Sequence, residues 1–338
     1  MAPQLQILRT TAELEALRPE WGALWQADAH ATPFQHPAWL VPWWHHFGQP
    51  ELRVLVLREE GRLVAVVPLY VYREPASGER QLLLVGAGTS DYLDGVFAPG
   101  LAVGELAAAL SEVLGEAGWD VAHFAQLRAR SLLQAAVGQL DCVAVEPYSG
   151  EATSRSVAVA ISGLPGKVRK EVLFAKNAAI AHGRLELVAA AGTEAVSAAF
   201  QELVRTHTER WQQAGESGVL ADPAVLAWHG EALPLLDKAG LLRLMTLRLG
   251  GESIGTLYSL IDGAGRTERT QYFYLMGFEL ARAELQPGRL LTAYAVEHAA
   301  AEGVRTIDML RGNETYKKFW HTAPVPTQGI ALRRKLHT

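Results

Sequence analysis

Residues 54–70 read VLVLREEGRLVAVVPLY, and residues 244–260 read LMTLRLGGESIGTLYSL. In each stretch, apolar side chains alternate with other residues on both sides of a glycine, Gly61 in the first and Gly251 in the second. This two-residue period around a turn predicts a β-hairpin in each half of the chain. The two glycines are 190 positions apart (251 − 61), which is the first indication of an internal repeat.

Two further pairs of segments keep nearly the same spacing. HPAWL at residues 36–40 resembles DPAVL at 222–226, and their prolines are 186 apart (223 − 37). EAGWDVAHFAQLR at 116–128 resembles AEGVRTIDMLRG at 301–312, and Gly118 and Gly303, where we expect helices to end, are 185 apart (303 − 118). The constant order and offset favour a tandem duplication of one α/β (α+β) unit, a mixed, mostly antiparallel central sheet flanked by helices. We place the units at residues 1–150 and 156–338, with a polar linker (PYSGEATSR) at 147–155.

Composition narrows the class of protein. The chain has 338 residues, of which 49% are hydrophobic and 20% charged, so it has the composition of a folded globular protein. A net charge of −5 does not favour a nucleic-acid partner. No stretch reads as a membrane span or a secretory signal, so we expect a cytoplasmic location. The single cysteine, Cys142, excludes an intrachain disulfide, and we expect no metal site.

A basic stretch, SGLPGKVRKEVLFAKNAAIAHGR, occupies residues 162–184 and is predicted to be helical. It sets one acid, Glu171, against five cations, which are Lys167, Arg169, Lys170, Lys176 and Arg184. A charge run of this kind is usually a solvated helix face. The alternative interpretation is a contact for the phosphates of a substrate or cofactor, and both stay open at this point.

QPGRLL at residues 286–291 precedes a predicted helix. Helix N-termini present unpaired backbone N–H groups that suit phosphate, and Gly288 would let a pyrophosphate approach the main chain. The alternative is a simple turn, which Pro287 and Gly288 also signal.

DMLRGNETYKKFW at residues 308–320 places Asp308 inside an apolar strand. A carboxylate there must be paired, and Arg311 is close in sequence. The alternatives are a structural ion pair followed by a surface helix, or a catalytic group. In the first half, GAGTSDYLD at residues 86–94 is either a capped turn or a set of acids that project into a cleft between the halves.

These segments together resemble the CelD-like acetyltransferases of the GNAT superfamily. The resemblance rests on the run from GFEL at residue 277 to DMLRGNETYKKFW, on HTERWQQAG at 207–215, on PFQHPAWLVPWW at 33–44 and on GAGTSDYLD at 86–94. It covers nearly the whole chain. The family is in turn similar to the Fem-type peptidyl transferases, which also pair two GNAT-like units.

The resemblance implies transfer of an acyl group from acetyl-CoA or another acyl-CoA to an amine or hydroxyl of a small molecule or glycan precursor. The implied cofactor-binding residues are Gln286, Pro287, Gly288, Arg289, Leu290 and Leu291. Tyr316 is the implied acid for the thiolate leaving group, and Asp308 and His207 are candidate bases or orienting groups. The candidate acceptor-binding residues are Asp91, Tyr92, Asp94, Arg210, Trp211, Arg311 and Lys317. The first unit lacks a PGRLL counterpart, so we expect it to shape the substrate site without a cofactor.

Two other functions remain open from the sequence. The duplicated body is also consistent with a non-catalytic protein that binds an envelope or polysaccharide precursor. A Fem-like transferase with aminoacyl-tRNA as donor would use the basic patches at Lys167 to Lys176 and at Arg333 to Lys335, although the net charge weakens that interpretation.

Overall fold

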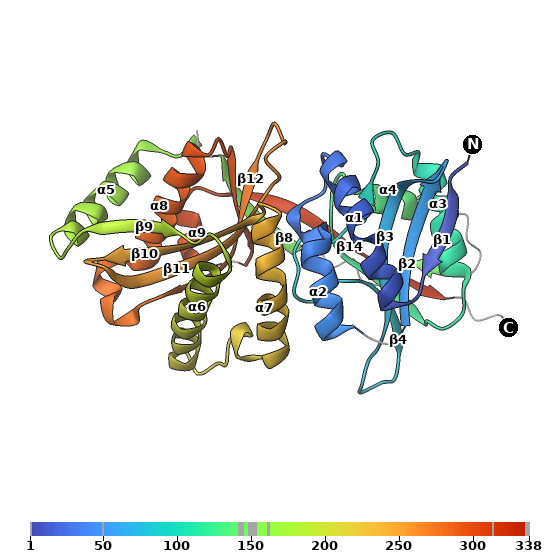
Figure 1. The fold of residues 1–338 in the computed structure, drawn as a ribbon, viewed down its shortest axis with the longest axis horizontal. Helices are drawn as coiled ribbons and strands as arrows, with labels where there is room; N and C mark the ends of the chain where they lie inside the picture. Colours follow the sequence, from blue (N-terminus) through green and yellow to red (C-terminus); the bar gives the residue numbers. More distant parts are fainter. Residues whose placement is uncertain are drawn as a thin grey trace. The chain divides into compact units, whose positions relative to one another are not determined.

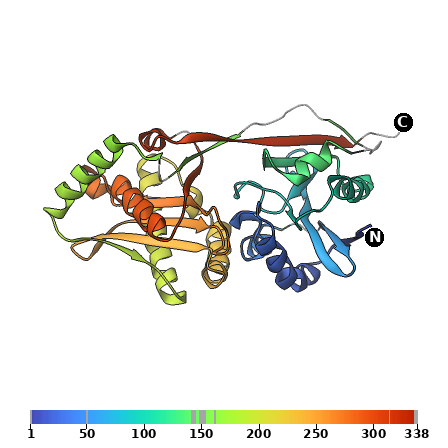
Figure 2. The same cartoon turned by 90° about the horizontal axis from the view of Figure 1, so that it is seen from above.

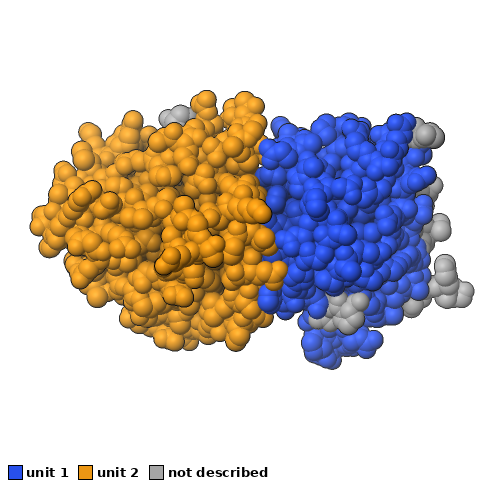
Figure 3. Space-filling model, viewed as in Figure 1, with its two compact units in different colours: residues 1–154, 326–338 blue, residues 155–325 orange. Residues whose placement is uncertain are grey.

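The computed structural model describes residues 2–48, 51–140, 145–147, 154–160, 163–312 and 314–334. The chain forms two compact units (Figure 3): unit 1 is Met1–Ser154 with Pro326–Thr338, and unit 2 is Arg155–Val325. The sequence-based boundary gave residues 156–338 to the second unit, whereas the C-terminal segment belongs to unit 1. Most of the predicted linker at 147–155 lies outside the described residues.

Unit 1 is a mixed sheet with helices on its faces (Figure 1). Its strands run in the order β1-β2-β3-β4-β6-β14, in which only the β4–β6 pair is parallel. The strands are β1 (Gln4–Leu8), β2 (Glu51–Glu59), β3 (Arg62–Arg73), β4 (Arg80–Leu84), β5 (Val96–Phe97), β6 (Val121–Arg128), β7 (Val145–Pro147) and β14 (Ala323–Arg334). The helices are α1 (Thr11–Ala27), η1 (Pro33–Gln35), α2 (Pro37–Phe47), α3 (Val103–Gly115) and α4 (Leu132–Val137).

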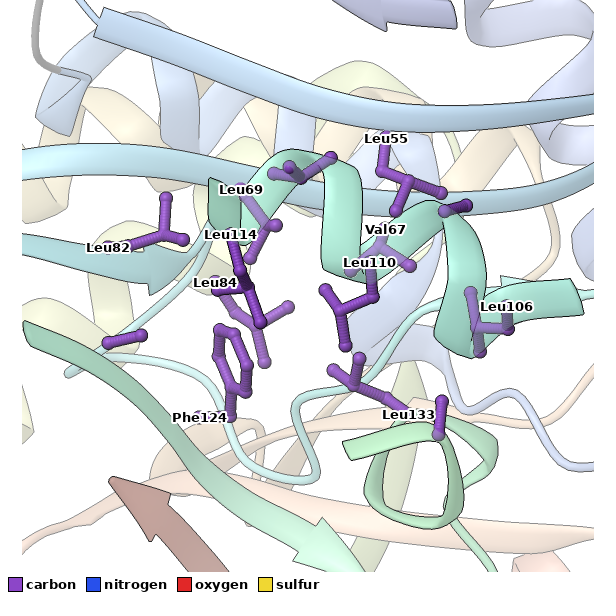
Figure 4. Packing of buried hydrophobic residues seen from close by; sticks show 14 of the residues in the cluster. Leu55, Val67, Leu69, Leu82, Leu84, Leu106, Leu110, Leu114, Phe124 and Leu133 are labelled. Carbon is purple, nitrogen blue, oxygen red and sulfur yellow. The ribbon is translucent and has the colours of Figure 1, made fainter. Parts of the chain in front are cut away.

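The core of unit 1 lies between the sheet and α3 (Figure 4). Leu106 and Leu110 of α3 pack against Leu55 of β2 and Val67 of β3, and all four are fully buried. These side chains recur at the helical and strand periods, so each element turns one apolar face inward. On the opposite sheet face, Trp43 of α2 stacks edge-on against Tyr70 of β3.

Unit 2 has the same kind of sheet, in the order β9-β10-β11-β12-β13-β8, and only its β12–β13 pair is parallel. Its strands are β8 (Ser154–Ala160), β9 (Leu185–Ala189), β10 (Leu242–Leu249), β11 (Glu252–Ile261), β12 (Thr270–Phe278) and β13 (Thr306–Arg311). Its helices are α5 (Gly166–Ile180), α6 (Thr193–Gln213), η3 (Val219–Ala221), α7 (Pro223–Lys238), η4 (Leu280–Leu285), α8 (Pro287–Ala301) and α9 (Thr315–Phe319).

The helices of unit 2 cover both faces of its sheet. Leu290 of α8 belongs to the same buried cluster as Leu257 of β11. The next residue of β11, Tyr258, packs against Phe200 of α6, so α6 and α8 lie on opposite faces because neighbouring strand residues point to opposite sides. Figures 1 and 2 show α5 beside α8, on the side of the strands away from α6.

Local geometry repeats between the two units. Both predicted hairpins form, as β2–β3 and β10–β11. Their two-residue turns have positive φ at both positions, at Glu60 and Gly61 in unit 1 and at Gly250 and Gly251 in unit 2. Each hairpin also has a bulge, after Leu57 in unit 1 and after Leu247 in unit 2, and these two positions are 190 residues apart. The predicted helix end at Gly303 is confirmed, with a C-cap at Glu302, whereas α3 ends at Gly115, before Gly118.

Each unit takes one strand of its sheet from the part of the chain that comes after the other unit's repeat. β14, at the C-terminal end, pairs with β6 in unit 1 (Figure 2), and β8, which precedes α5, pairs with β13 in unit 2. Each added strand runs antiparallel to its neighbour. Unit 1 is therefore incomplete without the C-terminal segment of the chain.

Candidate functional site

The candidate site of unit 2 begins where two parallel strands separate. β12 and β13 pair from Thr270 and Thr306 to Tyr272 and Asp308, and β12 then continues to Phe278 beyond that pairing. A bulge at Tyr274, between the residues paired with Tyr258 and Ser259, falls in this continuing part. Parallel strands that separate leave a wedge lined by one strand edge and by the helix that follows it.

A cavity of about 370 Å³ lies at this position. It is lined by Arg210 of α6, by Met276 and Phe278 of β12, and by Tyr316, Phe319 and Trp320 at α9, together with Ala283 and residues 286–289. The cavity brings together six of the residues predicted for the site, which are Arg210, Gln286, Pro287, Gly288, Arg289 and Tyr316.

The start of α8 forms one wall of the cavity. Gln286 adopts the left-handed conformation (φ 53°, ψ 53°) and Pro287 is the first helical residue. The N–H groups of Arg289 and Leu290 donate to the Gln286 carbonyl at 3.0 and 3.1 Å. The N–H of Gly288 has no carbonyl one turn earlier within the helix, so it is available to an anion at the positive end of the helix dipole.

Gly288 is fitted closely to its surroundings. A Cβ added at this position would lie 3.2 Å from Cε1 of Phe278 and 3.6 Å from Sδ of Met276. A larger side chain would therefore enter the cavity or displace its apolar wall. The glycine thus keeps space in front of the helix N-terminus.

The charge of the cavity is positive. Arg210 stacks over the Phe278 ring at 5.2 Å, and Arg289 stacks over the Phe319 ring at 4.2 Å. Among the described lining residues there is no aspartate or glutamate. Glu171, 3.9 Å from Arg289, is the carboxylate that approaches from α5. Two guanidinium groups and a helix N-terminus around an apolar floor suit an anionic ligand with an apolar or amphipathic arm.

Tyr316 is the titratable hydroxyl of the cavity. Desolvation, assisted by Glu314 and opposed by Arg210, raises the pKa of Tyr316 to about 12. The residue is still 46% exposed, so a ligand can reach it. The hydroxyl therefore keeps its proton at neutral pH.

Asp308 and Lys317 hold the end of β13. Asp308 is 5% exposed, and its carboxylate accepts from the Leu310 N–H at 2.8 Å, where φ of Leu310 is 56°. The Lys317 ammonium donates to the carbonyls of Leu310 and Arg311 and pairs with Glu314 at 2.9 Å. These contacts stabilise the bulged strand end, and neither residue lines the cavity.

His207 and Trp211 form a separate pair on α6. The indole N–H of Trp211 donates to Nε2 of His207 at 2.9 Å. Burial, with help from Arg210, lowers the pKa of His207 to about 4, so its ring is neutral at pH 7. Its remaining nitrogen, Nδ1, is buried without a hydrogen-bond partner. The accepting nitrogen of His207 is already used, and the pair lies outside the residues that line the cavity.

Other predicted residues of unit 2 lie elsewhere. Leu290 and Leu291 are fully buried in the core beneath α8 and do not face the cavity. Arg311 pairs through its backbone with Ser156 of β8. The sequence interpretation missed four apolar residues that line the cavity, which are Met276, Phe278, Phe319 and Trp320. The alternation along β12 was the available signal for Met276 and Phe278.

The acidic segment of unit 1 is packed within that unit. Asp91 and Tyr92 are 5% and 2% exposed. The Tyr92 carbonyl accepts from the Gln35 side chain, and the Arg128 guanidinium lies 5.5 Å from the Tyr92 ring centre. Asp94 accepts from the Gly95 N–H at 2.8 Å. An acceptor-binding role for Asp91, Tyr92 and Asp94 stays a prediction.

Asp94 is expected to make the stability of unit 1 depend on pH. Burial raises the pKa of Asp94 to about 6, while Ser131 and Gly95 lower it through hydrogen bonds. An unfolded aspartate has a pKa of about 3.9, so the folded state binds the extra proton between about pH 4 and 6 and loses stability as the pH rises through that window. We expect Asp94→Asn to raise the melting temperature at pH 8, where it increases the free energy of unfolding by at most about 3 kcal/mol. At pH 4 it should have little effect.

Asp120 provides a control of opposite sign for this melting experiment. A hydrogen bond from Arg80 lowers the pKa of Asp120, so its ionised form stabilises the fold above the unfolded pKa. Asp120→Asn should lower the melting temperature at pH 8, and that loss should disappear as the pH falls. A change in Asp94→Asn of equal size at both pH values would show that the buried carboxyl does not titrate as described.

In the described part of the chain, no helix has both the length and the apolar character needed to cross a bilayer. No group of three or more histidine, cysteine, aspartate or glutamate residues there is arranged to hold a metal ion.

Comparisons with known proteins match this architecture. Residues 166–318 match the sequence model of the acetyltransferase (GNAT) domain family, whereas no curated protein matches the chain. Among solved structures, FemX superposes with a TM-score of 0.64 at 11% identity, covering 96% of each chain. L-PGS from Bacillus licheniformis gives 0.57 at 14% identity, covering 97% of this chain and 92% of its own. A tandem GNAT protein from the clavulanic acid biosynthesis pathway gives 0.52 at 12% identity, covering 99% and 100%.

At these identities the solved structures support the fold alone, and they do so over nearly the whole chain. The fold class predicted from the sequence is confirmed, because each unit has mixed, mostly antiparallel strands flanked by helices. Residues 166–318 therefore match the GNAT acetyltransferase domain family, and the chain has the fold of two tandem GNAT-like units over nearly its whole length.

Proposed function

We propose that this protein is a CelD-like acyltransferase that moves an acyl group, with acetyl as the first candidate, from acyl-CoA to an amine or hydroxyl of a small molecule or glycan precursor. The observation that supports the proposal is the cavity at the start of α8, where two arginines and the Gly288 N–H surround an apolar floor. Unit 1 contributes the acceptor side, and the reaction takes place in the cytoplasm.

The cavity fits the parts of an acyl-CoA donor. Arg210 and Arg289 bear the charge that a pyrophosphate requires, and the N–H of Gly288 adds a main-chain donor. Met276 and Phe278 provide an apolar surface for the pantetheine arm on the free edge of β12. In unit 1, β4 ends at Leu84, one residue beyond its last pair with β6, so no comparable edge continues past the pairing.

Tyr316 is the proposed acid of the reaction. The acceptor nitrogen or oxygen forms a bond to the thioester carbonyl carbon, and the carbon–sulfur bond then breaks. Tyr316 gives its proton to the departing sulfur, while the acceptor loses its own proton to solvent or to a base. Asp308 acts as an orienting group, because it fixes the bulge that ends β13.

Calorimetric titration of the full chain with CoA tests the donor assignment. Binding of CoA, followed by transfer of labelled acetyl to a panel of amine and hydroxyl acceptors, would support the proposal. Failure to bind any CoA ester would leave a non-catalytic binding protein as the better explanation. Competition by aminoacyl-tRNA, with a steep salt dependence, would instead favour the Fem-like donor.

Tyr316→Phe should separate binding from catalysis. We expect kcat to fall by about 100-fold, because general acids contribute on the order of 100-fold or more, while CoA affinity stays within about threefold. Steady-state kinetics with calorimetry measures both. Lys318→Met serves as control, since Lys318 lies two residues further along α9 and does not line the cavity. An unchanged kcat across the pH range would remove Tyr316 from the mechanism.

A further inference from the structure

The outer face of α5 exposes large apolar side chains. α5 packs into the core that it shares with α8 through its buried residues, which are Val168, Val172, Ala175 and Ala179. On its other side, Leu173 is 58% exposed, Phe174 78% and Ile180 53%. Within the described residues, three of the six large apolar side chains that are exposed thus belong to this one helix. A cluster of this kind marks an interaction surface.

Basic residues accompany the apolar face. Residues 166–184 contain five lysines and arginines against one glutamate, in a chain whose net charge is −5. Lys170 is exposed and lies three and four positions before Leu173 and Phe174, so it shares their helix face. Lys167 and Arg184 have side chains that are 83% and 81% exposed at the two ends of this segment.

Lys176 does not belong to this exposed set, because its ammonium contacts Glu297 at 2.6 Å and stacks over Tyr294 at 4.0 Å. The remaining cations of the segment are Lys167, Arg169, Lys170 and Arg184, which we name the α5 basic set; Arg184 lies beyond the end of α5 and also pairs with Glu186 at 3.6 Å. Glu171 faces Lys167 at 4.0 Å and Arg289 at 3.9 Å and is the acid of this stretch.

The repeat matches β1 and α1 of unit 1 with β9 and α6 of unit 2. α5 precedes β9 and has no counterpart among the described elements of unit 1. An apolar cavity of about 410 Å³ lies between α5 and α8, with Leu173 and Arg169 among its lining residues.

We propose that α5 docks this protein on an anionic lipid bilayer. Leu173, Phe174 and Ile180 enter the boundary between headgroups and acyl chains, while the α5 basic set contacts lipid phosphates. A basic helix with an apolar face lies in the plane of a bilayer for these two reasons. The protein then reaches acceptors at a membrane surface, and the docking does not depend on the donor site.

Two other occupants explain less of this surface. A nucleic acid would use the cations, but its phosphate backbone gives no reason for three exposed aliphatic and aromatic side chains. A second copy of the chain, docked face to face through α5, would bring the two basic sets opposite each other, and like charges disfavour that contact.

Vesicle co-sedimentation of the full chain tests the proposal at about 0.1 M salt. We expect binding to phosphatidylglycerol vesicles to exceed binding to phosphatidylcholine vesicles by at least about tenfold. The double variant Leu173→Ser/Phe174→Ser should weaken binding to phosphatidylglycerol by at least about tenfold, since two apolar anchors are removed. Lys167→Glu/Lys170→Glu should abolish the preference for the anionic lipid.

Val219→Ser is the matched control, because Val219 is also an exposed apolar residue of unit 2, at 42%, but lies on η3. It should bind vesicles as the unaltered protein does, and all variants should keep their melting temperature and CoA affinity. Equal binding to both lipids, or unchanged binding of the double serine variant, would overturn the proposal. A dimer of the unaltered protein that is lost in the double serine variant would also overturn the proposal. Binding of the protein to tRNA but not to vesicles would do the same.

Discussion

A Gly288→Val variant is expected to lose CoA binding almost completely while it keeps its fold. The valine Cβ would stand 3.2 Å from the Phe278 ring, and its methyl groups would occupy the space in front of the α8 N-terminus. A phosphate could then no longer reach the Gly288 N–H or lie between Arg210 and Arg289. Loss of one or two charge-assisted hydrogen bonds corresponds to about 3 kcal/mol, or roughly 100-fold in Kd.

Gly104 provides the matched control for this substitution. It occupies the second position of α3 in unit 1, as Gly288 does in α8 of unit 2, and the two are 184 residues apart (288 − 104). A Cβ at Gly104 would have only Gln139 Oε1 within 4 Å, at 3.9 Å. Gly104→Val carries the same helix-propensity change without entering a cavity wall. Calorimetry and melting curves on both variants would measure affinity and stability separately.

The pair of variants also tests where the donor binds. Loss of CoA binding in Gly288→Val alone would assign the donor to unit 2, as the continuing edge of β12 favours. Loss in Gly104→Val alone would assign it to unit 1 and would contradict the proposed function. If both variants bound CoA like the unaltered protein, the α8 N-terminus would have no part in binding.

The sequence carried enough information to predict the hairpins and the helix start at Pro287, because both depend on local signals. Paired positive-φ positions at Gly250 and Gly251, and the proline-glycine step at the start of α8, restrict the backbone within a few residues. The repeat was predictable as well, because the matching segments of the two halves keep a nearly constant spacing. Leu310 and Gln126, both with positive φ, lie 184 residues apart (310 − 126) and extend it to a backbone feature that sequence matching cannot detect.

The direction of individual side chains was not predictable at the same level. Tyr316 and Lys317 are neighbours on a five-residue helix, and one residue rotates by about 100° around a helix. Tyr316 therefore faces the cavity while Lys317 is 4% exposed and binds the end of β13. Leu290 and Leu291 follow the same rule, since they turn toward the core one turn after Pro287. A short helix offers too few residues to fix its phase from sequence.

The partner of a terminal strand was not predictable either. β14 has a buried, alternating pattern that any neighbouring strand edge could satisfy, and register depends on which side is buried. The sequence-based boundary therefore kept residues 326–338 with the nearer repeat. Pairing of Leu332 with Ala122 of β6 is a contact across more than half the chain, and only the tertiary structure shows it.

Removing residues 326–338 should therefore unfold unit 1 and leave unit 2 folded. Leu332 is part of the unit 1 core and Ile330 packs against it. Deleting one buried leucine or isoleucine side chain typically costs 2–5 kcal/mol, so the loss of both approaches the entire stability of an ordinary domain, about 5–15 kcal/mol. The deletion would also leave β6 as an unpaired edge in place of its bonds to β14.

Hydrogen exchange on a chain that ends after Val325 would show which unit loses amide protection. Amides of β4 and β6 in unit 1 should exchange at least about 100-fold faster, because exchange from core strands reports the local free energy of opening. Amides of β11 and β12 should stay protected, since every strand that pairs with them lies within residues 155–325. A chain ended after Arg334 keeps all of β14 and should behave as the full protein. Faster exchange in β12 and β13 with protection retained in β6 would mean that the C-terminal strand stabilises unit 2 instead, and that it is not part of unit 1.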